Sequence, residues 1–254
     1  MTSDLAVALV PHGEPPVYLT FRALGALGLA HATTTKHCPG LRPFAHEAGP
    51  FAPESHGALA PAGVDIARAA FAKKQVHGAD AIHVTRAGSG GFADILVTTE
   101  PRRPLAIFTA DCLAIILWDS VARVLGVAHV GWRGTVRGAA QAAVRAAREQ
   151  GARPDWIHAA IAPSIGPCCY EVDAPVIREF VQAYGRRAEA WMRPVRDGHV
   201  MLDLWAANET LLADAGLNPG HVENARLCTA CHPDLLHSYR RRDLGRLVTV
   251  AALG

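Results

Sequence analysis

The fold is decided by the stretch LAIFTADCLAIILWDSVARVLGVAHVGWRG, which runs from Leu105 to Gly134. It contains three apolar runs, each long enough to form a buried β-strand. These runs lie near Leu105–Thr109, Ala114–Trp118 and Leu125–Val130. The polar pair Asp119-Ser120 separates the last two runs and is typical of a turn. The stretch therefore predicts three strands joined by short connections.

The same reading extends to the rest of the chain. Further strands are predicted near Val17–Leu24, Ala70–Val76, Ala81–Thr85, Ile95–Thr98, Trp156–Ile161, Val222–Cys228 and Leu247–Ala252. Helices are predicted over Thr135–Glu149, Asp173–Tyr184 and Asp203–Ala215, each with a Thr or Asp that can cap its start. Residues 33–61 are rich in Pro, Gly, His and Ala and predict irregular chain. With no convincing linker, we expect one α+β domain over residues 1–254, built on mixed sheets with helices outside.

The composition limits the partners and the compartment. Of the 254 residues, 50% are hydrophobic and 19% are charged, and the formal net charge is +2, so nothing demands a nucleic acid as partner. The N-terminus has no basic region, and no stretch approaches the ~20 apolar residues of a membrane helix. We therefore expect a cytoplasmic protein whose six cysteines are reduced thiols or metal ligands. The sequence leaves the oligomeric state open.

Three residues are candidate ligands of a soft metal ion. His77, Cys112 and His129 each lie within or at the end of a predicted strand. Two imidazoles and one thiolate suit zinc, and a site with three protein ligands leaves one position for water or substrate. Taken singly, each residue has a structural alternative: a hydrogen-bonded histidine, or a cysteine that packs as a small hydrophobe. Together they indicate a catalytic metal site.

Arginines near these segments are candidates for binding an anion. Arg133 follows Gly131-Trp132 beside the predicted start of the helix at Thr135, where a phosphate would be favoured. The alternative is an arginine that packs or faces solvent. Arg240 and Arg241 form a basic segment whose alternative is a solvated turn or a salt-bridge partner.

Four further cysteines occur in two pairs, Cys168-Cys169 and the C-x-x-C pair Cys228 and Cys231. Together they could form a Cys₄ zinc site. However, the adjacent pair lacks the two-residue spacer of zinc-binding pairs. The preferred interpretation is that these cysteines line the floor near the active pocket or are simply buried.

The amino-acid sequences of four segments resemble those of a known family. The segments are Gln75 to Val84, Phe108 to Leu113, Val127 to Gly134 and Ser238-Tyr239-Arg240-Arg241. They resemble the YfiH-like laccase-domain family, also described as multicopper polyphenol oxidase-like and as purine nucleoside phosphorylase. The resemblance implies that His77, Cys112 and His129 bind the metal, zinc or else copper. We further expect catalytic roles for Cys112 and Arg133, and substrate binding by Arg133 and by Arg240 and Arg241, which match the family's Ser-Tyr-Arg-Arg segment.

The resemblance further implies an activity. The expected reactions are phosphorolysis of adenosine, inosine, guanosine or methylthioadenosine, and deamination of adenosine, so the partners are a small-molecule nucleoside and phosphate. One zinc ion with an open position can lower the pKa of bound water to about 7 for attack on a purine. The chain departs from the family at residues 32–40, where a Gly-Gly loop is not evident and Lys36 stands in for an arginine. This departure affects the expected substrate range.

The sequence is also compatible with three functions other than a nucleoside phosphorylase. Copper-dependent oxidation of phenols is one, although a multicopper site typically needs His-x-His pairs and this chain has none. A metal-free hydrolase with Cys112 as nucleophile and His129 or His77 as base needs the same residues. A non-enzymatic binding module is disfavoured by the clustered His and Cys side chains.

Overall fold

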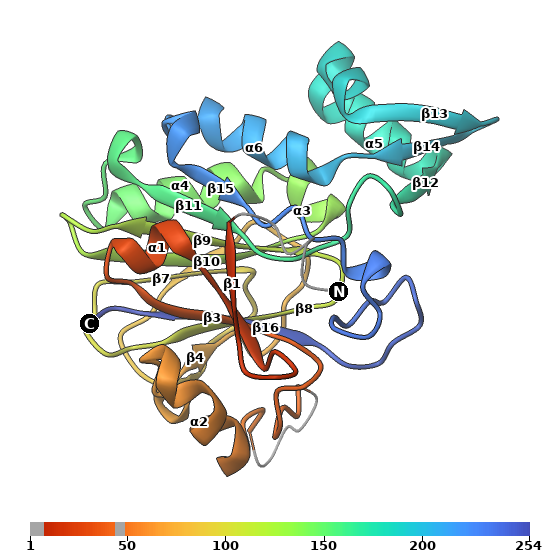
Figure 1. The fold of residues 1–254 in the computed structure, drawn as a ribbon. Coiled ribbons are helices and arrows are strands. Elements are labelled where there is room, and N and C mark those ends of the chain that lie inside the picture. Colours follow the sequence, from red (N-terminus) through yellow and green to blue (C-terminus); the bar gives the residue numbers. More distant parts are fainter. Residues whose placement is uncertain (1–7, 44–48) are drawn as a thin grey trace.

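Two β-sheets packed face to face form the centre of the computed structural model, which describes residues 8–43 and 49–254 (Figure 1). The six-stranded sheet contains, in spatial order, β15 (Val222–Asn224), β11 (His158–Ile161), β9 (Leu113–Asp119), β10 (Val124–Val130), β7 (Ile95–Thr98) and β5 (Ala81–His83). The seven-stranded sheet contains β1 (Leu9–His12), β2 (Tyr18–Phe21), β3 (Ala30–Thr34), β16 (Leu247–Ala252), β8 (Leu105–Thr109), β4 (Ala70–Phe71) and β6 (Gly88–Ser89). Both sheets mix parallel and antiparallel pairs.

Strand β9 shows why the predicted run Ala114–Trp118 is apolar at every residue. Leu113 and Ile115 belong to the core cluster that includes α4 (Ala139–Glu149). Ala114 and Ile116 belong to the cluster shared with the seven-stranded sheet. Because both faces of β9 are covered, the strand reads as a continuous hydrophobic run and not as an alternating one.

Helices surround the sheets, with α4 and α6 (Leu204–Asp214) over the six-stranded sheet and α2 (Pro53–Leu59) on the side of the seven-stranded sheet (Figure 1). They are α1 (Arg22–Ala26), α2, α3 (Trp132–Val136), α4, α5 (Ala174–Tyr184) and α6. Short 3-10 helices are η1 (Ala60–Ala62), η2 (Ile66–Arg68), η3 (Pro154–Trp156), η4 (Gly185–Trp191), η5 (Pro219–His221) and η6 (Thr229–Cys231). A small third sheet of β12 (Glu171–Asp173), β14 (His199–Leu202) and β13 (Met192–Arg196) lies beside α5. The predicted α+β class with mixed sheets is confirmed.

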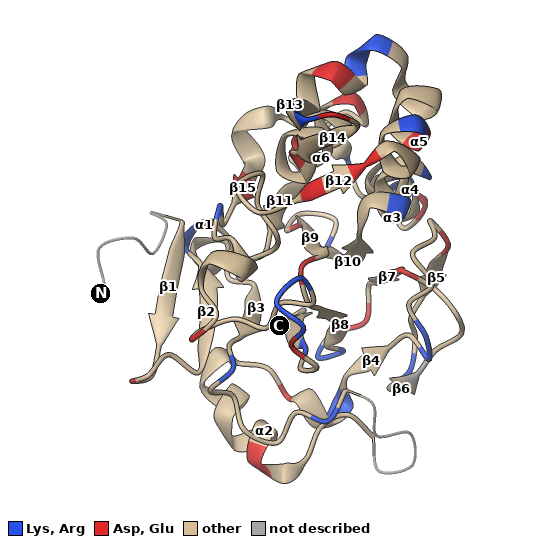
Figure 2. Cartoon of the chain, turned by 90° about the vertical axis from the view of Figure 1, so that its right-hand side faces the viewer, with Lys and Arg blue, Asp and Glu red and all other residues tan. Residues whose placement is uncertain are grey.

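Two surface properties follow from this architecture. None of the helices in the described ranges combines the length and the apolar character that crossing a bilayer would require. Basic and acidic positions are interspersed along the part of the chain seen in Figure 2.

Strands with two covered faces match their prediction. β7, β8 and β16 have the predicted bounds Ile95–Thr98, Leu105–Thr109 and Leu247–Ala252. The helices α5 and α6 each begin one residue after the predicted aspartate. Asp203 caps α6, since its carboxylate accepts a 2.9 Å hydrogen bond from the Ala206 N–H.

The predicted helix Thr135–Glu149 is wrong at its start. The chain becomes helical at Trp132, ends α3 at Val136, and begins α4 at Ala139 after Gly138, which has a φ of 74°. Glycine adopts this left-handed conformation without strain, so it permits the break between the two helices. Thr135 therefore lies inside α3, where its hydroxyl donates to the Gly131 carbonyl at 3.1 Å.

Other differences arise where an apolar run has no strand partner. Predicted strand Val17–Leu24 ends at Phe21 and continues as α1, Ala70–Val76 pairs only over Ala70–Phe71, and Val222–Cys228 only over Val222–Asn224. Residues 33–61 are not irregular throughout, because they include the end of β3 and all of α2. Residues 44–48 of that range lie outside the described residues.

Candidate metal centre

The three predicted ligands come together at the junction of the two large sheets. His77 lies in the loop between β4 and β5, Cys112 in the bend between β8 and β9, and His129 in β10. Their ligand atoms all lie within 4.8 Å of one another. Because β8 and β9 belong to different sheets, Cys112 sits where the chain crosses from one to the other. His77 is not at a strand end, in contrast to the expectation.

Asp94 fixes the orientation of His129. One Asp94 oxygen lies 2.7 Å from His129 Nδ1, and both side chains are almost fully buried. When Nδ1–H donates to this carboxylate, the lone pair of Nε2 is free to bind a cation. Sequence analysis missed Asp94. Its only signal was a single acidic residue directly before the buried strand β7.

The same carboxylate shapes the loop that carries His77. It accepts hydrogen bonds from three successive backbone N–H groups, those of Val76 at 3.1 Å, His77 at 3.0 Å and Gly78 at 2.7 Å. These three hydrogen bonds hold His77 at a φ of 58°, a left-handed conformation that a non-glycine residue adopts only when its surroundings impose it. Asp94 therefore positions two of the three candidate ligands.

Two further contacts tie this loop to its surroundings. The Gln75 side-chain amide donates to the Phe108 carbonyl at 2.7 Å and accepts from the Phe108 N–H at 2.9 Å, which anchors the loop to β8. Arg137 donates to the His77 carbonyl at 2.9 Å. The loop is thus held from both sheets before any ligand binds.

Hydrogen bonding sets the protonation of the buried pair. Loss of water around the Cys112 sulfur would raise its pKa, but hydrogen bonds from His129 and His77 outweigh this effect and lower the pKa to about 6. Burial would likewise lower the pKa of His129, yet its bonds to Asp94 and Cys112 raise that pKa to about 9. The site therefore favours a Cys112 thiolate beside a His129 imidazolium, and a metal ion that binds both would displace the proton from His129 Nε2.

Gly131 leaves the space in which the ligands meet. A Cβ atom at this position would lie 2.8 Å from Cys112 Sγ and 3.2 Å from His77 Cδ2. The contact with Sγ is closer than a Cβ atom can make, and the contact with Cδ2 is tight enough to shift the His77 ring, so a side chain here would fill the cradle between the ligands. The donor set and the open cradle both fit a zinc ion.

Gly131→Ala should weaken metal binding by about 10–100-fold, the range seen when groups that orient metal ligands are changed. The Gly131 φ of −90° suits alanine, so the effect comes from the clash with the ligands and not from the backbone. Metal dissociation constants from competition with a chelator measure it. Gly134→Ala, whose Cβ would make an ordinary 3.4 Å contact with the Ala139 Cβ, is the matched control. Unchanged affinity in Gly131→Ala would show that the ligands do not converge there.

Asp111 orients a neighbouring loop. It has a φ of 86°, and its carboxylate accepts from the Thr229 hydroxyl at 2.6 Å and the Arg240 N–H at 2.7 Å. These bonds hold the residue directly before Cys112 in a strained conformation. Asp111 therefore holds the segments of Thr229 and Arg240 against the bend that carries Cys112.

The predicted anion-binding arginines occupy different positions. Arg133 is exposed and stacks on the Trp132 ring, with its guanidinium carbon 4.3 Å from the ring centroid. Arg240 donates to the carbonyls of Cys169 at 3.3 Å and Glu171 at 3.0 Å. Arg241 donates from Nε to the Ala230 carbonyl at 2.9 Å.

Tyr170 lies close to the centre and was missed by the sequence analysis. Burial and the negative charge of Cys112 raise the pKa of its phenol. The charges of Arg240 and Arg133 act in the opposite direction on the same pKa. The Arg240 guanidinium also lies over the Tyr170 ring, 5.3 Å from its centroid. A neutral phenol and two guanidinium groups thus gather near Cys112.

The remaining cysteine pairs form a second cluster. The sulfurs of Cys168, Cys169, Cys228 and Cys231 all lie within 4.8 Å of one another. The interpretation that these residues are simply buried is wrong, because Cys168 and Cys231 are exposed. The missing spacer of the adjacent pair does not keep the sulfurs apart, since residues 167–169 form a turn in which two consecutive side chains can face the same point.

Comparison with known proteins places the chain in a family. The model of the family described as multi-copper polyphenol oxidoreductase laccase matches residues 56–254. The chain belongs to this laccase-domain family. The predicted resemblance is therefore confirmed, and the match includes all three candidate ligands of the metal centre.

Individual members of the laccase-domain family have enzyme names. A protein named adenosine deaminase, from an unknown prokaryotic organism, is 37% identical over 148 residues, which cover 58% of this chain and 56% of that protein. A purine nucleoside phosphorylase of Deinococcus radiodurans is 40% identical over 183 residues, covering 70% of this chain and 68% of the relative. The matched part thus spans little more than half of the first relative's length.

A solved structure supports the fold over nearly the whole chain. The crystal structure of the hypothetical protein YfiH of Bacillus licheniformis superimposes with a TM-score of 0.83 at 27% sequence identity. The superposition covers 94% of this chain and 97% of that one. The arrangement of mixed sheets is therefore shared with that protein.

Proposed function

We propose that the chain is a zinc-dependent purine nucleoside phosphorylase with accompanying adenosine deaminase activity, acting on adenosine, inosine, guanosine and methylthioadenosine. The names of family members motivate the reaction class. The observation that carries the proposal is the convergence of His77, Cys112 and His129 within 4.8 Å, with three ligands and therefore one position left open. A zinc ion bound there would supply Lewis-acid polarisation of a substrate atom or water.

The chain's own residues prepare this centre. The Asp94 carboxylate accepts a hydrogen bond from His129 Nδ1–H. This bond fixes the ring so that Nε2 faces Cys112 and His77. The hydrogen bonds from both histidines stabilise the Cys112 thiolate. Because the loop contacts already fix the ligands, little reorganisation accompanies binding, and such preorganisation is what catalysis by charge stabilisation needs.

Arg133 is our candidate for binding phosphate. Within the described residues its guanidinium makes no hydrogen bond or ion pair, and its stack on Trp132 leaves the N–H donors free. Arg133 follows Gly131 by two residues, and Gly131 borders Cys112 and His77, so the chain brings Arg133 near the metal centre. A fork of N–H donors matches phosphate geometry, and orientation is the main requirement of phosphorolysis.

We propose that Arg240 and Arg241 also bind substrate, each through the guanidinium N–H groups that its contacts to backbone carbonyls leave available. Their contacts to the Cys169, Glu171 and Ala230 carbonyls hold them beside the site. In Arg240 the stack on Tyr170 fixes the plane of the guanidinium. Arg133 is thus the more available cation, and the two others have a shaping role as well.

Copper-dependent oxidation of phenols is the second candidate, favoured by the description of the family model. A His₂Cys set can hold one copper ion, and copper binds N and S ligands more tightly than zinc does. A metal-free hydrolase is the third, favoured by the Cys112 thiolate beside His129. Turnover of metal-stripped protein separates the hydrolase from both metal enzymes, and reloading with zinc or copper separates the other two.

Arg133→Ala should lower phosphorolysis by about 10–100-fold and raise the KM for phosphate, as expected for losing a charged hydrogen bond of ~1.5–3 kcal/mol. Deamination of adenosine needs no phosphate, so it should fall much less. Both reactions are assayed on the same zinc-loaded preparation.

The exposed Arg148, near the far end of α4, provides the matched control, and Arg148→Ala should leave both rates unchanged. Equal loss of both reactions in Arg133→Ala would assign Arg133 to the nucleoside or the fold. No loss of either would return it to an ordinary surface arginine. If the zinc-loaded wild type releases no purine base in the presence of phosphate, the proposed function itself is wrong.

A further inference from the structure

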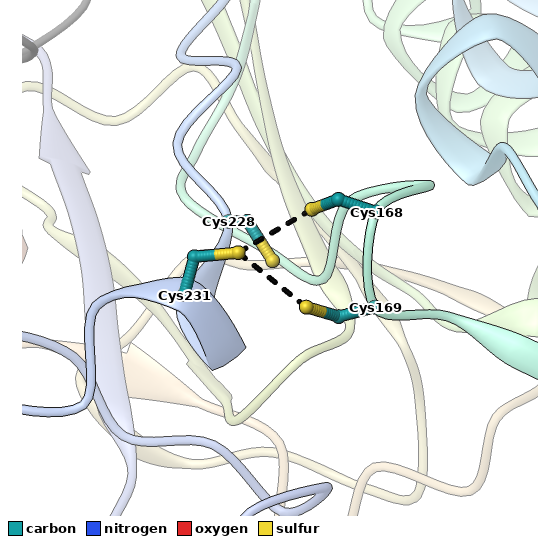
Figure 3. Close-up of side chains that lie close together, drawn as sticks. All are labelled: Cys168, Cys169, Cys228 and Cys231. Carbon is teal, nitrogen blue, oxygen red and sulfur yellow. Dashed lines mark hydrogen bonds between the residues drawn. The ribbon is translucent and has the colours of Figure 1, made fainter.

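Four cysteine sulfurs outside the candidate metal centre point toward one another (Figure 3). Cys231 Sγ lies 3.5 Å from Cys168 Sγ and 3.4 Å from Cys169 Sγ, and all four sulfurs lie within 4.8 Å of one another. Four thiolates around one zinc ion, with Zn–S near ~2.3 Å, have sulfurs about 3.8 Å apart. The cluster therefore already has the size of a tetrahedral Cys₄ cage.

The backbone explains how two adjacent cysteines can face one point. Residues 167–169 form a turn, in which the Cys169 N–H bonds the Gly166 carbonyl at 3.0 Å and the Tyr170 N–H bonds the same carbonyl at 3.1 Å. In such a turn the side chains do not alternate as they would in a strand. Gly166 is required here, since a Cβ would lie 2.6 Å from the Trp205 ring.

The other two ligands come from the C-x-x-C segment around η6. Side chains three residues apart on a 3-10 turn lie on the same side, which brings Cys228 and Cys231 together. The Gly166 N–H donates to Cys228 Sγ at 3.3 Å. A backbone donor to the sulfur stabilises a thiolate, so each half of the cluster supports the other.

The surrounding charge suits a bound metal. A divalent ion with four thiolates carries a net charge of about −2. Arg240 donates to the carbonyl of Cys169, and Arg241 to that of Ala230 inside η6, so two guanidinium groups lie against the segments that supply the sulfurs. Cys168 and Cys231 are exposed, which gives an ion a route in.

We propose that Cys168, Cys169, Cys228 and Cys231 bind one zinc ion as a structural site, separate from the His77–Cys112–His129 centre. Tetrahedral S₄ sets select zinc, and a site closed by four protein ligands leaves no position for substrate. The ion would join the turn after β11 to η6, two segments that the isolated parallel bridge between Ser164 and Cys228 already brings side by side.

The structural site supports the catalytic one through a short chain of contacts. Thr229, which lies between Cys228 and Cys231, donates to Asp111 at 2.6 Å, and the Ile165 N–H donates to the Asp111 carbonyl at 2.8 Å. Asp111 directly precedes Cys112. A zinc ion in the Cys₄ site would thus hold Thr229 and, through it, the bend that carries Asp111 and Cys112, without contacting the substrate.

Zinc content of the purified chain and its variants tests this inference. We expect about two zinc ions per wild-type chain, about one in Cys231→Ser and about one in Cys112→Ala, which lacks the thiolate of the other centre. Cys38→Ala removes a buried cysteine outside both clusters and should keep about two. Cobalt loaded into Cys112→Ala should show the absorption of sulfur-to-cobalt charge transfer, and the double variant Cys112→Ala/Cys231→Ser should lose it.

Other outcomes would overturn the inference. One is a folded Cys112→Ala chain that holds no zinc and takes up no cobalt. Another is fewer than the six free thiols after unfolding in chelator, which would identify a disulfide in the cluster. Iron in place of zinc would overturn the choice of ion. None of these readouts uses turnover, so the Cys₄ site stands or falls independently of the proposed activity.

Discussion

Cys112→Ala should reduce nucleoside turnover by at least ~10²–10³-fold, the cost of removing one strong electrostatic element from an active site. It should also lower the zinc content by one ion per chain. The physical reason is that the two histidines alone leave too few ligands for a tight site. The fold should survive, because Cys112 lies in a bend and the strands β8 and β9 on either side of it are almost entirely buried. Metal analysis and both activity assays on one preparation measure the effect.

The control for this variant is Cys38→Ala, which removes a buried thiol from another core cluster and should change neither property. Thermal unfolding separates loss of metal from loss of fold. The thermal unfolding midpoint of Cys112→Ala should equal that of wild-type protein from which the metal at the His77–Cys112–His129 centre has been removed. The reason is that a ligand that binds only the folded state stabilises it by mass action. Full turnover in Cys112→Ala would rule out chemistry at this centre.

The sequence predicted best what local pattern controls. Strands β8 and β16 are continuous apolar runs because both faces are covered, so their bounds can be read directly. The helix α6 is marked by Asp203 at its start and Gly216 after its end. The three candidate ligands were found because they lie in segments whose sequences resemble the family. Two histidines and one cysteine by themselves already indicated a soft metal ion.

Long-range pairing accounts for what the sequence did not reveal. Asp94 and His129 are 35 residues apart, and they meet because β7 and β10 pair side by side. Cys169 and Cys231 are 62 residues apart and meet through a turn whose shape no spacing rule describes. The break at Gly138 depends on one φ angle inside an otherwise helical pattern. The first two cases depend on tertiary contacts, whereas the third depends on a local backbone conformation.

Asp94→Ala should destabilise the folded chain by about 3–5 kcal/mol, because it leaves buried donors without their charged partner. The carboxylate has no exposed surface and accepts from His129 and from three backbone N–H groups. Asp94→Asn is the gentler change: one oxygen still accepts, but the amide N–H₂ faces groups that are themselves donors. We expect this variant to fold and to bind zinc at the His77–Cys112–His129 centre about 10–100-fold more weakly. Chemical unfolding and chelator competition measure the two effects.

Asp119→Asn is the matched control that separates the two roles of Asp94. Asp119 is also buried and also accepts from three backbone N–H groups, those of Val121, Ala122 and Arg153. It ends β9, whereas Cys112 precedes the start of that strand, so it lies at the opposite end from the metal centre. Asp119→Asn should therefore lose stability and keep its zinc affinity. If both variants lost affinity equally, the loss would reflect general destabilisation. If Asp94→Asn kept full affinity, the bond to His129 Nδ1 would not be what holds the ligand in place.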